Sequence, residues 1–425
     1  MTGPWIESAG TLGAALAFLG GGMVILCVAL TYAELAAAMP SAGGEHVYSL
    51  RALGAKWSFV CSWAIVFGYM AVAAFEAVAL PYALAQFFPA INKTTLWVIA
   101  DWPVSLGSVM LGIAASIMIT WINILGIRPA AFVQKLVTLG ILLSGFVFLS
   151  GVTVNGSANF FEPLFVSGYQ GVFTVLIMVP IMFVGFDVIP QTAEEINLPF
   201  ETIGRLVVVS VMAAILWYVM MIIGVGFSLD QTARANAGLT TADASGAVWG
   251  DPMARTLLII GGIAGILTSW NAFIVGASRL IFAMAVDGQL PRFLADIHPK
   301  YGTPYKALLL LGFINCLSPW FGRPVLIWLL NAGSFGVIVA YVLVSLAFLF
   351  LRVKEPQMPR PFKLKYGKIV GATALLLSIA MCLLFVPGSP AALAWPYEWG
   401  ICLGWVLLGS LLWALGRRES ALRSL

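Results

Sequence analysis

A single carboxylate, Asp187, lies within an apolar stretch and has the clearest potential for chemistry in this chain. The segment 175–200 reads VLIMVPIMFVGFDVIPQTAEEINLPF, and Pro180, Gly185 and Pro190 interrupt its helical pattern on both sides of the acid. Proline removes a helical hydrogen bond, and glycine permits backbone geometry that a side chain blocks. Inside a bilayer, irregular backbone survives only where it lines a protein cavity, and an acid there is a candidate functional group. The pattern therefore predicts a broken membrane helix around a cavity.

The residues near the acid predict a binding pocket, and they leave two roles open for Asp187. Freed carbonyl groups near the break could accept hydrogen bonds from a substrate ammonium. Asp187 could carry a proton, because burial disfavours the charged form of an acid. It could also cap the second half-helix by accepting hydrogen bonds from its free N–H groups, and the two roles are compatible. The candidate pocket residues here are Ile181, Met182, Phe183, Gly185 and Phe186.

A second acid, Glu76, lies about midway along the apolar stretch 57–89, in the sequence FEAVALP. A glutamate in the middle of a membrane needs a partner or a proton. Glu76 could bind a second amine of a substrate or take part in proton coupling. Alternatively, it is a neutral, hydrogen-bonded acid that holds two helices together.

The composition places these residues in a membrane protein. Of the 425 residues, 61% are hydrophobic and 9% are charged, whereas soluble domains have roughly 25% charged residues. The five cysteines lie in or beside apolar runs without paired spacing, so we interpret them as small core residues. His46 and His298 have no metal-ligand spacing, and the glycine-rich SAGGE lacks the lysine of a phosphate loop. We therefore expect no metal, no cofactor, no nucleic-acid partner and no ATP-driven transport.

Eleven apolar stretches are long enough to cross a bilayer, which needs about 20 residues. They are 11–39, 57–89, 104–125, 130–153, 170–196, 203–229, 253–286, 306–322, 324–351, 368–387 and 396–416. If the loop 40–56 faces the cytoplasm, all but four of the 22 Lys and Arg residues fall on the cytoplasmic side. Positive residues favour that side, so we expect a cytoplasmic C-terminus and an external N-terminus.

Four stretches resemble the amino acid–polyamine–organocation (APC) transporters. They are YAELAAAMPSAGGEHVYSLRALG at 32–54, VGFDVIPQTAEEINLPFETIGR at 184–205, SRLIFAMAVDGQLPRFLADIHPKYGTP at 278–304 and RPFKL at 360–364. They occur in the family order and span most of the chain, and the third is the most specific.

The resemblance implies one permease domain, 1–425, that is all-α and has a five-plus-five inverted-repeat transporter fold with two extra C-terminal helices. The remainder of the first repeat would be 11–153, the second repeat 170–351, and the extra helices 368–416. TGPW at 2–5 resembles the residues that follow the family's first helix. We therefore expect that helix, and its glycine-rich part of the binding site, to be absent here, through either a start codon placed too late or a true truncation.

The resemblance also implies further pocket residues. Trp270, Asn271 and Phe273 lie where relatives have an aromatic wall, although a Trp in a span is more often core or interface. Asn331 and Ser334, in NAGSFG, could face the pocket, or this small-residue stretch could serve helix packing. Proton-driven relatives have a lysine on the fifth helix, but the matching position here falls near Ile141.

Charged residues near the cytoplasmic ends of their spans could form an ion-pair network that closes the cytoplasmic side and opens during transport. Static pairing or ordinary exposure at the membrane surface is the alternative. The candidates are Glu34, Glu194, Glu195, Arg279 and Asp287.

The leading functional hypothesis is a secondary carrier in the cell membrane. It would move an amino acid or related amine by alternating access, with protons and the lipid bilayer as its other partners. An amine or polyamine exchanger and a non-transporting truncated remnant are the alternatives. A membrane enzyme would need a convergent nucleophile, base or metal cluster, and a channel would need repeated filter sequences; we find neither pattern.

Overall fold

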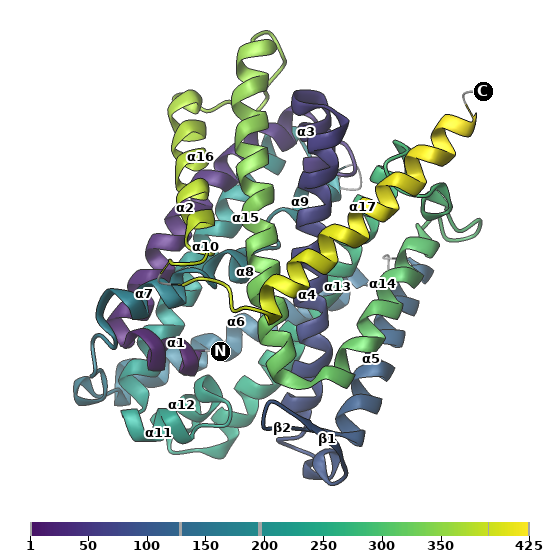
Figure 1. Cartoon of the computed structure of the whole chain (residues 1–425). Helices are drawn as coiled ribbons and strands as arrows, with labels where there is room; N and C mark the ends of the chain where they lie inside the picture. Colours follow the sequence, from purple (N-terminus) through teal and green to yellow (C-terminus); the bar gives the residue numbers. More distant parts are fainter. Residues whose placement is uncertain (1, 127–129, 194–197, 390, 424–425) are drawn as a thin grey trace.

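Helices make up most of the computed structural model, which describes residues 2–126, 130–193, 198–389 and 391–423 (Figure 1). The long helices are α2 (Thr11–Ala38), α4 (Ala55–Leu84), α5 (Leu106–Leu125), α6 (Ala130–Asn155), α10 (Phe200–Ser228), α13 (Pro252–Val286), α14 (Tyr305–Leu317), α15 (Gly322–Lys354), α16 (Gly367–Leu383) and α17 (Tyr397–Arg423). The short helices are α1 (Thr2–Ala9), α3 (Glu45–Leu53), α7 (Gly168–Leu176), α8 (Val179–Phe183), α9 (Val188–Gln191), α11 (Gln231–Asn236) and α12 (Thr240–Trp249).

Strand structure among the described residues is limited to one antiparallel hairpin. β1 (Thr95–Ile99) pairs with β2 (Trp102–Ser105), and the register joins Ile99 to Trp102 and Thr95 to Ser105. The hairpin lies at the bottom of Figure 1, at the opposite end of the molecule from α3. We call these two ends the hairpin end and the α3 end.

Eight helical segments among the described residues are long and apolar enough to cross a membrane. One of them, Tyr305–Lys354, contains both α14 and α15, which meet at the 3-10 turn η5 (Ser318–Phe321). Helix α16 is apolar but shorter, and the fifth predicted span is divided among α7, α8 and α9. With these differences, each of the eleven predicted spans corresponds to helical structure. The predicted all-α, polytopic membrane fold is confirmed.

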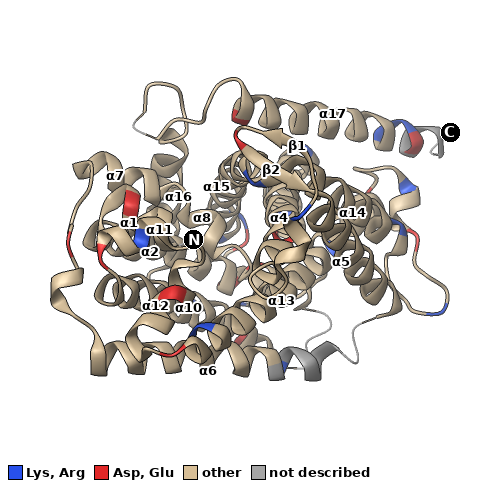
Figure 2. Cartoon of the chain, turned by 90° about the horizontal axis from the view of Figure 1, so that it is seen from below, with Lys and Arg blue, Asp and Glu red and all other residues tan. Residues whose placement is uncertain are grey.

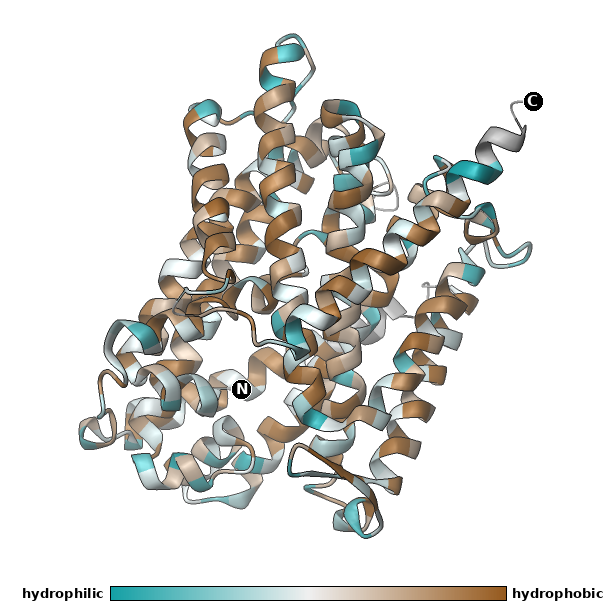
Figure 3. Cartoon of the chain, viewed as in Figure 1, coloured by the Kyte–Doolittle hydropathy of each residue, from teal (hydrophilic) through white to brown (hydrophobic). Residues whose placement is uncertain are grey.

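The distribution of polar residues fits this membrane fold. Apolar residues cover the middle of the long helices, and hydrophilic residues gather at both ends of the molecule (Figure 3). Viewed from the hairpin end, the chain has few charged residues among many neutral ones (Figure 2). A bilayer favours this distribution because burying an unpaired charge in hydrocarbon is costly.

The helices pack in pairs that relate the two halves of the chain. Helix α2 packs against α10, α4 against α13, and α5 against α14. The contact of α4 with α15 has its counterpart in the contact of α13 with α6. Gly333 lets α15 approach α4 closely, because a Cβ atom there would lie 2.5 Å from the Cβ of Ala71. Small residues at such crossings allow close packing where lipid supplies little driving force.

The predicted break is present in the middle of this bundle. Helix α8 ends at Phe183 and α9 begins at Val188, and Figure 1 labels both between α2, α15 and α4. Pro180 stands in the first turn of α8, where its missing N–H is not needed. Gly185 has a φ of 126°, which L side chains rarely adopt. The local sequence thus forces the chain out of helical geometry at this depth.

Candidate functional site

Asp187 lies at the break and is fully buried. Its Oδ1 accepts a hydrogen bond from the backbone N–H of Gly185 at 2.8 Å. The residue stands at the N-cap position of α9, but its side chain makes no capping hydrogen bond to that helix. The carboxyl group is therefore turned towards the break itself.

Aromatic rings surround the break on the side of α2 and α15. The hydroxyl of Tyr341 lies 3.4 Å from Oδ2 of Asp187. The rings of Tyr32, Phe186 and Tyr341 lie 5.4 to 5.9 Å apart in each pairing. All three side chains are buried, so they shield the acid from bulk water.

Helix α13 borders the break from the other side. The nearest group to a Cβ placed on Gly185 would be the ring of Phe273, at 3.7 Å. The ring of Phe273 lies 5.6 Å from that of Tyr69, which is fully buried on α4. The structure thus brings Phe273 together with Gly185, Phe186 and Asp187.

The other predicted residues of the broken helix have mixed surroundings. Ile181 and Phe183 are buried, and the backbone carbonyl of Met182 accepts a hydrogen bond from the hydroxyl of Tyr218 at 2.8 Å. The ring of Phe183 lies 5.3 Å from that of Tyr218, on α10. Helix α8 is therefore held to α10 as well as to the core around Asp187.

Several predicted pocket residues form hydrogen bonds to neighbouring helices. The hydroxyl of Ser334 donates to the carbonyl of Ile177 at 2.7 Å, which joins α15 to the end of α7. Oδ1 of Asn271 accepts from Nδ2 of Asn123 on α5 at 2.8 Å. Asn331 donates to Oε1 of Glu398, in the first turn of α17, at 2.7 Å. Their polar groups are occupied by helix-to-helix hydrogen bonds.

Glu76 is buried on α4 and accepts a hydrogen bond from the hydroxyl of Ser269 on α13. Its second oxygen, Oε2, has no hydrogen-bond partner among the described residues. The indole nitrogen of Trp270, which is fully buried, likewise has no partner there. Glu76 therefore links α4 to α13, and its Oε2 could accept a further hydrogen bond.

The predicted network of charges is divided between separate contacts at the α3 end. Glu34 is buried and accepts hydrogen bonds from Arg352 and from the backbone N–H of Leu364, and it forms an ion pair with Arg360 at 3.0 Å. Oδ2 of Asp287 lies 2.8 Å from Nε2 of His46. 

The other residues of the predicted network are Arg279, Glu194 and Glu195. Nη1 of Arg279 donates to the carbonyl of Val275 on its own helix at 3.2 Å. Glu194 and Glu195 lie outside the described residues.

The sequence reasoning missed a set of polar residues near Asp187. Glu45 and Gln191 are fully buried and hydrogen-bonded to each other, and His46 is also buried. The tyrosines around the acid were missed because a Tyr in an apolar run reads as core. A spacing signal was available on α4, where Ser62, Tyr69 and Glu76 recur every seven residues and so share one helical face.

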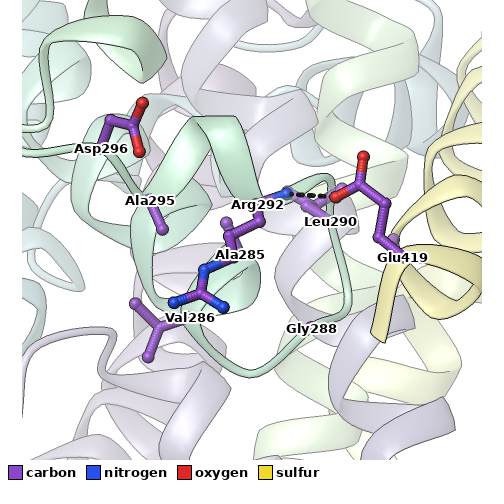
Figure 4. A pocket seen from close by; sticks show the side chains of 9 residues that line it. Ala285, Val286, Gly288, Leu290, Arg292, Ala295, Asp296 and Glu419 are labelled. Carbon is purple, nitrogen blue, oxygen red and sulfur yellow. Dashed lines mark hydrogen bonds between the residues drawn. The ribbon is translucent and has the colours of Figure 1, made fainter. Parts of the chain in front are cut away.

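A pocket of about 400 Å³ opens near the α3 end, away from the break (Figure 4). The backbone N–H of Arg292 donates to Oε2 of Glu419 at 3.0 Å across this pocket, and Asp296 lies on its rim. No residue of α8 or α9 lines it. We place the candidate site at the break, because the buried acid and irregular backbone are there. Within the described residues, no group of three or more His, Cys, Asp or Glu side chains could hold a metal ion.

Comparisons with known proteins agree with this architecture. Residues 1–408 match the family model described as amino acid permease. The chain is 26% identical over 404 residues to the branched-chain amino acid permease BcaP of Bacillus subtilis, which covers 90% of this chain and 83% of that protein. It is 25% identical to the methylthioribose transporter of the same species, over 96% of this chain and 86% of that protein.

A mammalian relative shows the same extent of similarity. The chain is 27% identical to the large neutral amino acids transporter small subunit 2 of Rattus norvegicus, over 97% of this chain and 75% of that protein. The match covers nearly the whole chain, including the broken helix and the α3 region. With its polytopic helical fold, this chain belongs to the amino acid permease family, as its resemblance to the APC transporters implied.

Proposed function

We propose that this chain moves an amino acid or related amine across the cell membrane by alternating access, coupled to protons. Membership of the amino acid permease family supports the transport of amino acids or related compounds. One observation carries the proton coupling: Asp187 is fully buried beside unwound backbone, and it has no ion-pair partner among the described residues. A buried acid without a cation is stabilised by a proton or by a bound cationic group.

In this proposal the substrate binds at the junction of α8 and α9. The positive φ of Gly185 turns peptide groups out of the helical ladder, where they are free to bind the amino and carboxylate groups of a substrate. Phe273 and Phe186 supply apolar walls on two sides of the junction. Ile181, Met182, Phe183, Trp270, Asn271 and Ser334 complete the proposed lining.

We assign the α3 end to the cytoplasm, because the predicted topology collects most Lys and Arg residues there. The C-terminus then lies in the cytoplasm. Glu34, Glu195, Arg279 and Asp287 form the proposed cytoplasmic gate. The contact of Asp287 with His46 joins the end of α13 to α3, and its opening would release the substrate.

Uptake into proteoliposomes tests this function. The purified chain is reconstituted and given radiolabelled amino acids and amines in turn, with the external medium either more acidic than the lumen or at the same pH. The panel includes leucine, larger neutral amino acids, methylthioribose and cationic amino acids. We expect accumulation of at least one compound above its external concentration only with the pH gradient. Equal uptake with and without the gradient would remove proton coupling and leave facilitated transport or exchange.

The panel should also compare the uptake of cationic and neutral substrates, because Glu76 could bind a positively charged group. Its Oε2 has no partner among the described residues, so it could receive the ammonium of a basic side chain. Preference for lysine or a diamine over leucine would favour this role. Preference for leucine would favour a neutral, structural Glu76.

A further inference from the structure

A second fully buried carboxyl group, that of Glu45, lies at the α3 end of the molecule. Glu45 is the first residue of α3 and is 0% exposed. Its Oε2 accepts a hydrogen bond from Nε2 of Gln191, the last residue of α9. Its Oε1 and the Oε1 of Gln191 have no hydrogen-bond partner among the described residues. The short helix α9 therefore has Asp187 at its start and Glu45 bonded to its end.

Within the part of the chain that the structure describes, the charge of Glu45 has no basic counterpart. Among the described residues, none of the ion pairs includes Glu45 or Asp187. The side chains of α2, α3, α4, α9 and α15 that interact electrostatically with Glu45 are acidic or neutral, namely Tyr32, Tyr48, Cys61, Tyr69, Asp187 and Tyr341. Ionisation of both carboxyl groups at the same time is strongly unfavourable in such surroundings. The pair is therefore stable with a proton on at least one member.

Burial raises the pKa of the Glu45 carboxyl group well above its ordinary value, and the nearby negative charge of Asp187 raises it further. The negative charge of Asp187 thus favours protonation of Glu45.

The next residue, His46, connects the buried region around Glu45 with the surface of the protein. His46 is only 1% exposed, and its Nδ1 lies 3.0 Å from the hydroxyl of Ser58 and 3.1 Å from that of Ser62. Its Nε2 lies 2.8 Å from Oδ2 of Asp287, whose side chain is 42% exposed. A titratable ring therefore lies between a buried acid and an acid that meets water.

Helix α4 has further polar side chains on one face, from its start at the α3 end to the middle of the membrane. Ser58, Ser62, Tyr69 and Glu76 follow one another at spacings of four, seven and seven residues, which keeps them on one face. Ser62 and Glu76 are separated by about 21 Å along the helix axis at 1.5 Å per residue. The hydroxyl of Tyr69 lies within this stretch and interacts with both Asp187 and Glu45. Hydroxyl groups of this kind can pass a proton between acids that do not touch.

We propose that Glu45 is a proton-exchange residue of the transport cycle, which receives the proton that leaves Asp187 and passes it through His46 to Asp287 and the cytoplasm. This role rests on the proton coupling proposed above. In the first step the O–H bond of protonated Asp187 breaks, and the proton binds the Glu45 carboxylate, which becomes neutral. In the second step Glu45 loses the proton to the neutral His46 ring. The imidazolium then releases it to water beside Asp287, so over the whole sequence Asp187 loses one proton, water gains it, and Glu45 and His46 return to their starting states. Asp187 then binds the next proton from the external side, so the two carboxylates do not stay ionised together.

Glu45→Gln tests the role, because the amide keeps the size of the side chain but cannot carry a proton. Wild-type chain and variant are reconstituted in parallel with radiolabelled leucine, or with the panel compound that the wild-type chain accumulates best. We expect the variant to lose accumulation driven by the pH gradient and to keep exchange of labelled for unlabelled substrate. Glu201→Gln, which changes an exposed acid at the start of α10, is the matched control and should retain both activities.

The outcomes separate this role from the proposed function. If the wild-type chain responds to the pH gradient and Glu45→Gln responds equally, the role of Glu45 is wrong and proton coupling stands. If the wild-type chain shows no response to the gradient, both proposals fail. Loss of exchange as well as accumulation in Glu45→Gln would assign the residue to folding or substrate binding, and would overturn the relay.

A second variant and a spectroscopic readout keep the test decisive if Glu45→Gln does not fold. His46→Gln keeps a hydrogen-bonding side chain but removes the titratable ring, and we expect pH-driven accumulation to fall by a larger factor than exchange. Infrared difference spectra of the wild-type chain, recorded as the pH is raised, should show loss of a carbonyl band from a protonated carboxyl group. Glu45→Asp should keep such a band, shifted in position. Unchanged accumulation in His46→Gln together with absence of the band would reject the route.

Discussion

At the scale of single residues, the chemistry depends on acids buried without cations. Asp187 accepts hydrogen bonds from the backbone N–H of Gly185 and the hydroxyl of Tyr341, which are both neutral donors. Glu34 is equally buried, but it is surrounded by Arg352 and Arg360. The two acids therefore have different tasks: Glu34 is satisfied by permanent charges, whereas Asp187 needs a proton or a ligand.

Asp187→Asn should abolish accumulation driven by a pH gradient and leave the protein folded. The amide is nearly the same size, can still accept the hydrogen bond from Gly185, and cannot release a proton. Uptake and exchange in proteoliposomes, with thermal unfolding of the detergent-solubilised chain as a control for folding, measure this. Accumulation at the wild-type level would remove Asp187 from proton coupling.

The pKa shift of Glu45 predicts the direction in which stability depends on pH. Because burial raises the pKa of Glu45, the folded chain holds this proton more tightly than the unfolded chain. The resulting stabilisation is fully present below the ordinary pKa of glutamic acid and is lost as the pH rises through the raised value. Melting temperatures of the wild-type chain should fall over this range more than those of Glu45→Gln. Parallel pH profiles for the two chains would contradict the assignment.

At the scale of elements, the break between α8 and α9 is determined by local sequence. Hydrophobicity predicted a span at 170–196, and Pro180, Gly185 and Pro190 predicted where it would break. The structure has the helix ends Phe183 and Val188 on either side of Gly185. Both signals are local in the chain, which is why the sequence was sufficient to find them.

Gly185→Ala should impair transport through backbone strain. A Cβ atom there has no neighbour closer than 3.7 Å, so the cost comes from the φ of 126° rather than from a clash, and should be about 1–3 kcal/mol. Gly262→Ala is the matched control, because Gly262 lies within α13 and a Cβ there meets nothing within 4 Å. Unfolding and uptake assays compare the two variants. Equal behaviour of both would show that the positive φ is not needed.

The ion cluster of Glu34 holds α2 to the end of α15 and to the following loop. Glu34→Ala would leave two arginines without their partner and should cost about 3–5 kcal/mol of stability. Glu201→Ala removes an exposed pair with Arg205 on one helix and should have no measurable effect. Thermal unfolding in detergent measures both. A small loss for Glu34→Ala would indicate that the cluster opens readily, as a gate requires.

At the scale of the whole molecule, the pairing of helices supports two related halves. We propose repeats with the boundaries 11–153 and 170–351, followed by two helices within 368–416. The contacts α2–α10, α4–α13 and α5–α14 join elements at matching positions of these halves. Rocking of one set of helices against the other around the break would then expose Asp187 to each side in turn.

The proposed topology predicts which side of the membrane each loop faces. Lys93→Cys, after η1 (Pro89–Asn92) near the hairpin end, should react with an impermeant thiol reagent from outside the cell. Lys365→Cys, between α15 and α16, should react only after the membrane is opened. The unsubstituted chain, whose five cysteines are buried or half-buried, is the control. Reversed labelling would invert the orientation and the direction of the proposed proton route.

The sequence by itself determined the membrane setting, the positions of the spans, the family and the broken helix. These features follow from hydrophobicity, from the positions of proline and glycine, and from sequence motifs. Each of these signals is contained in a short stretch of chain, so it does not depend on how distant segments pack. It also identified Asp187 and Glu76 as buried acids, because a charge is conspicuous in an apolar span.

Only the tertiary structure decided which polar groups meet. Asn271 accepts a hydrogen bond from Asn123, 148 residues away, and Gln191 donates one to Glu45, 146 residues away. Hydrophobic patterning indicates that a residue is inside, but it does not specify which of several surrounding helices will face it. Glu45 and His46 read as a loop after two glycines, and their burial against α9 and α13 depends on how the whole bundle closes around them.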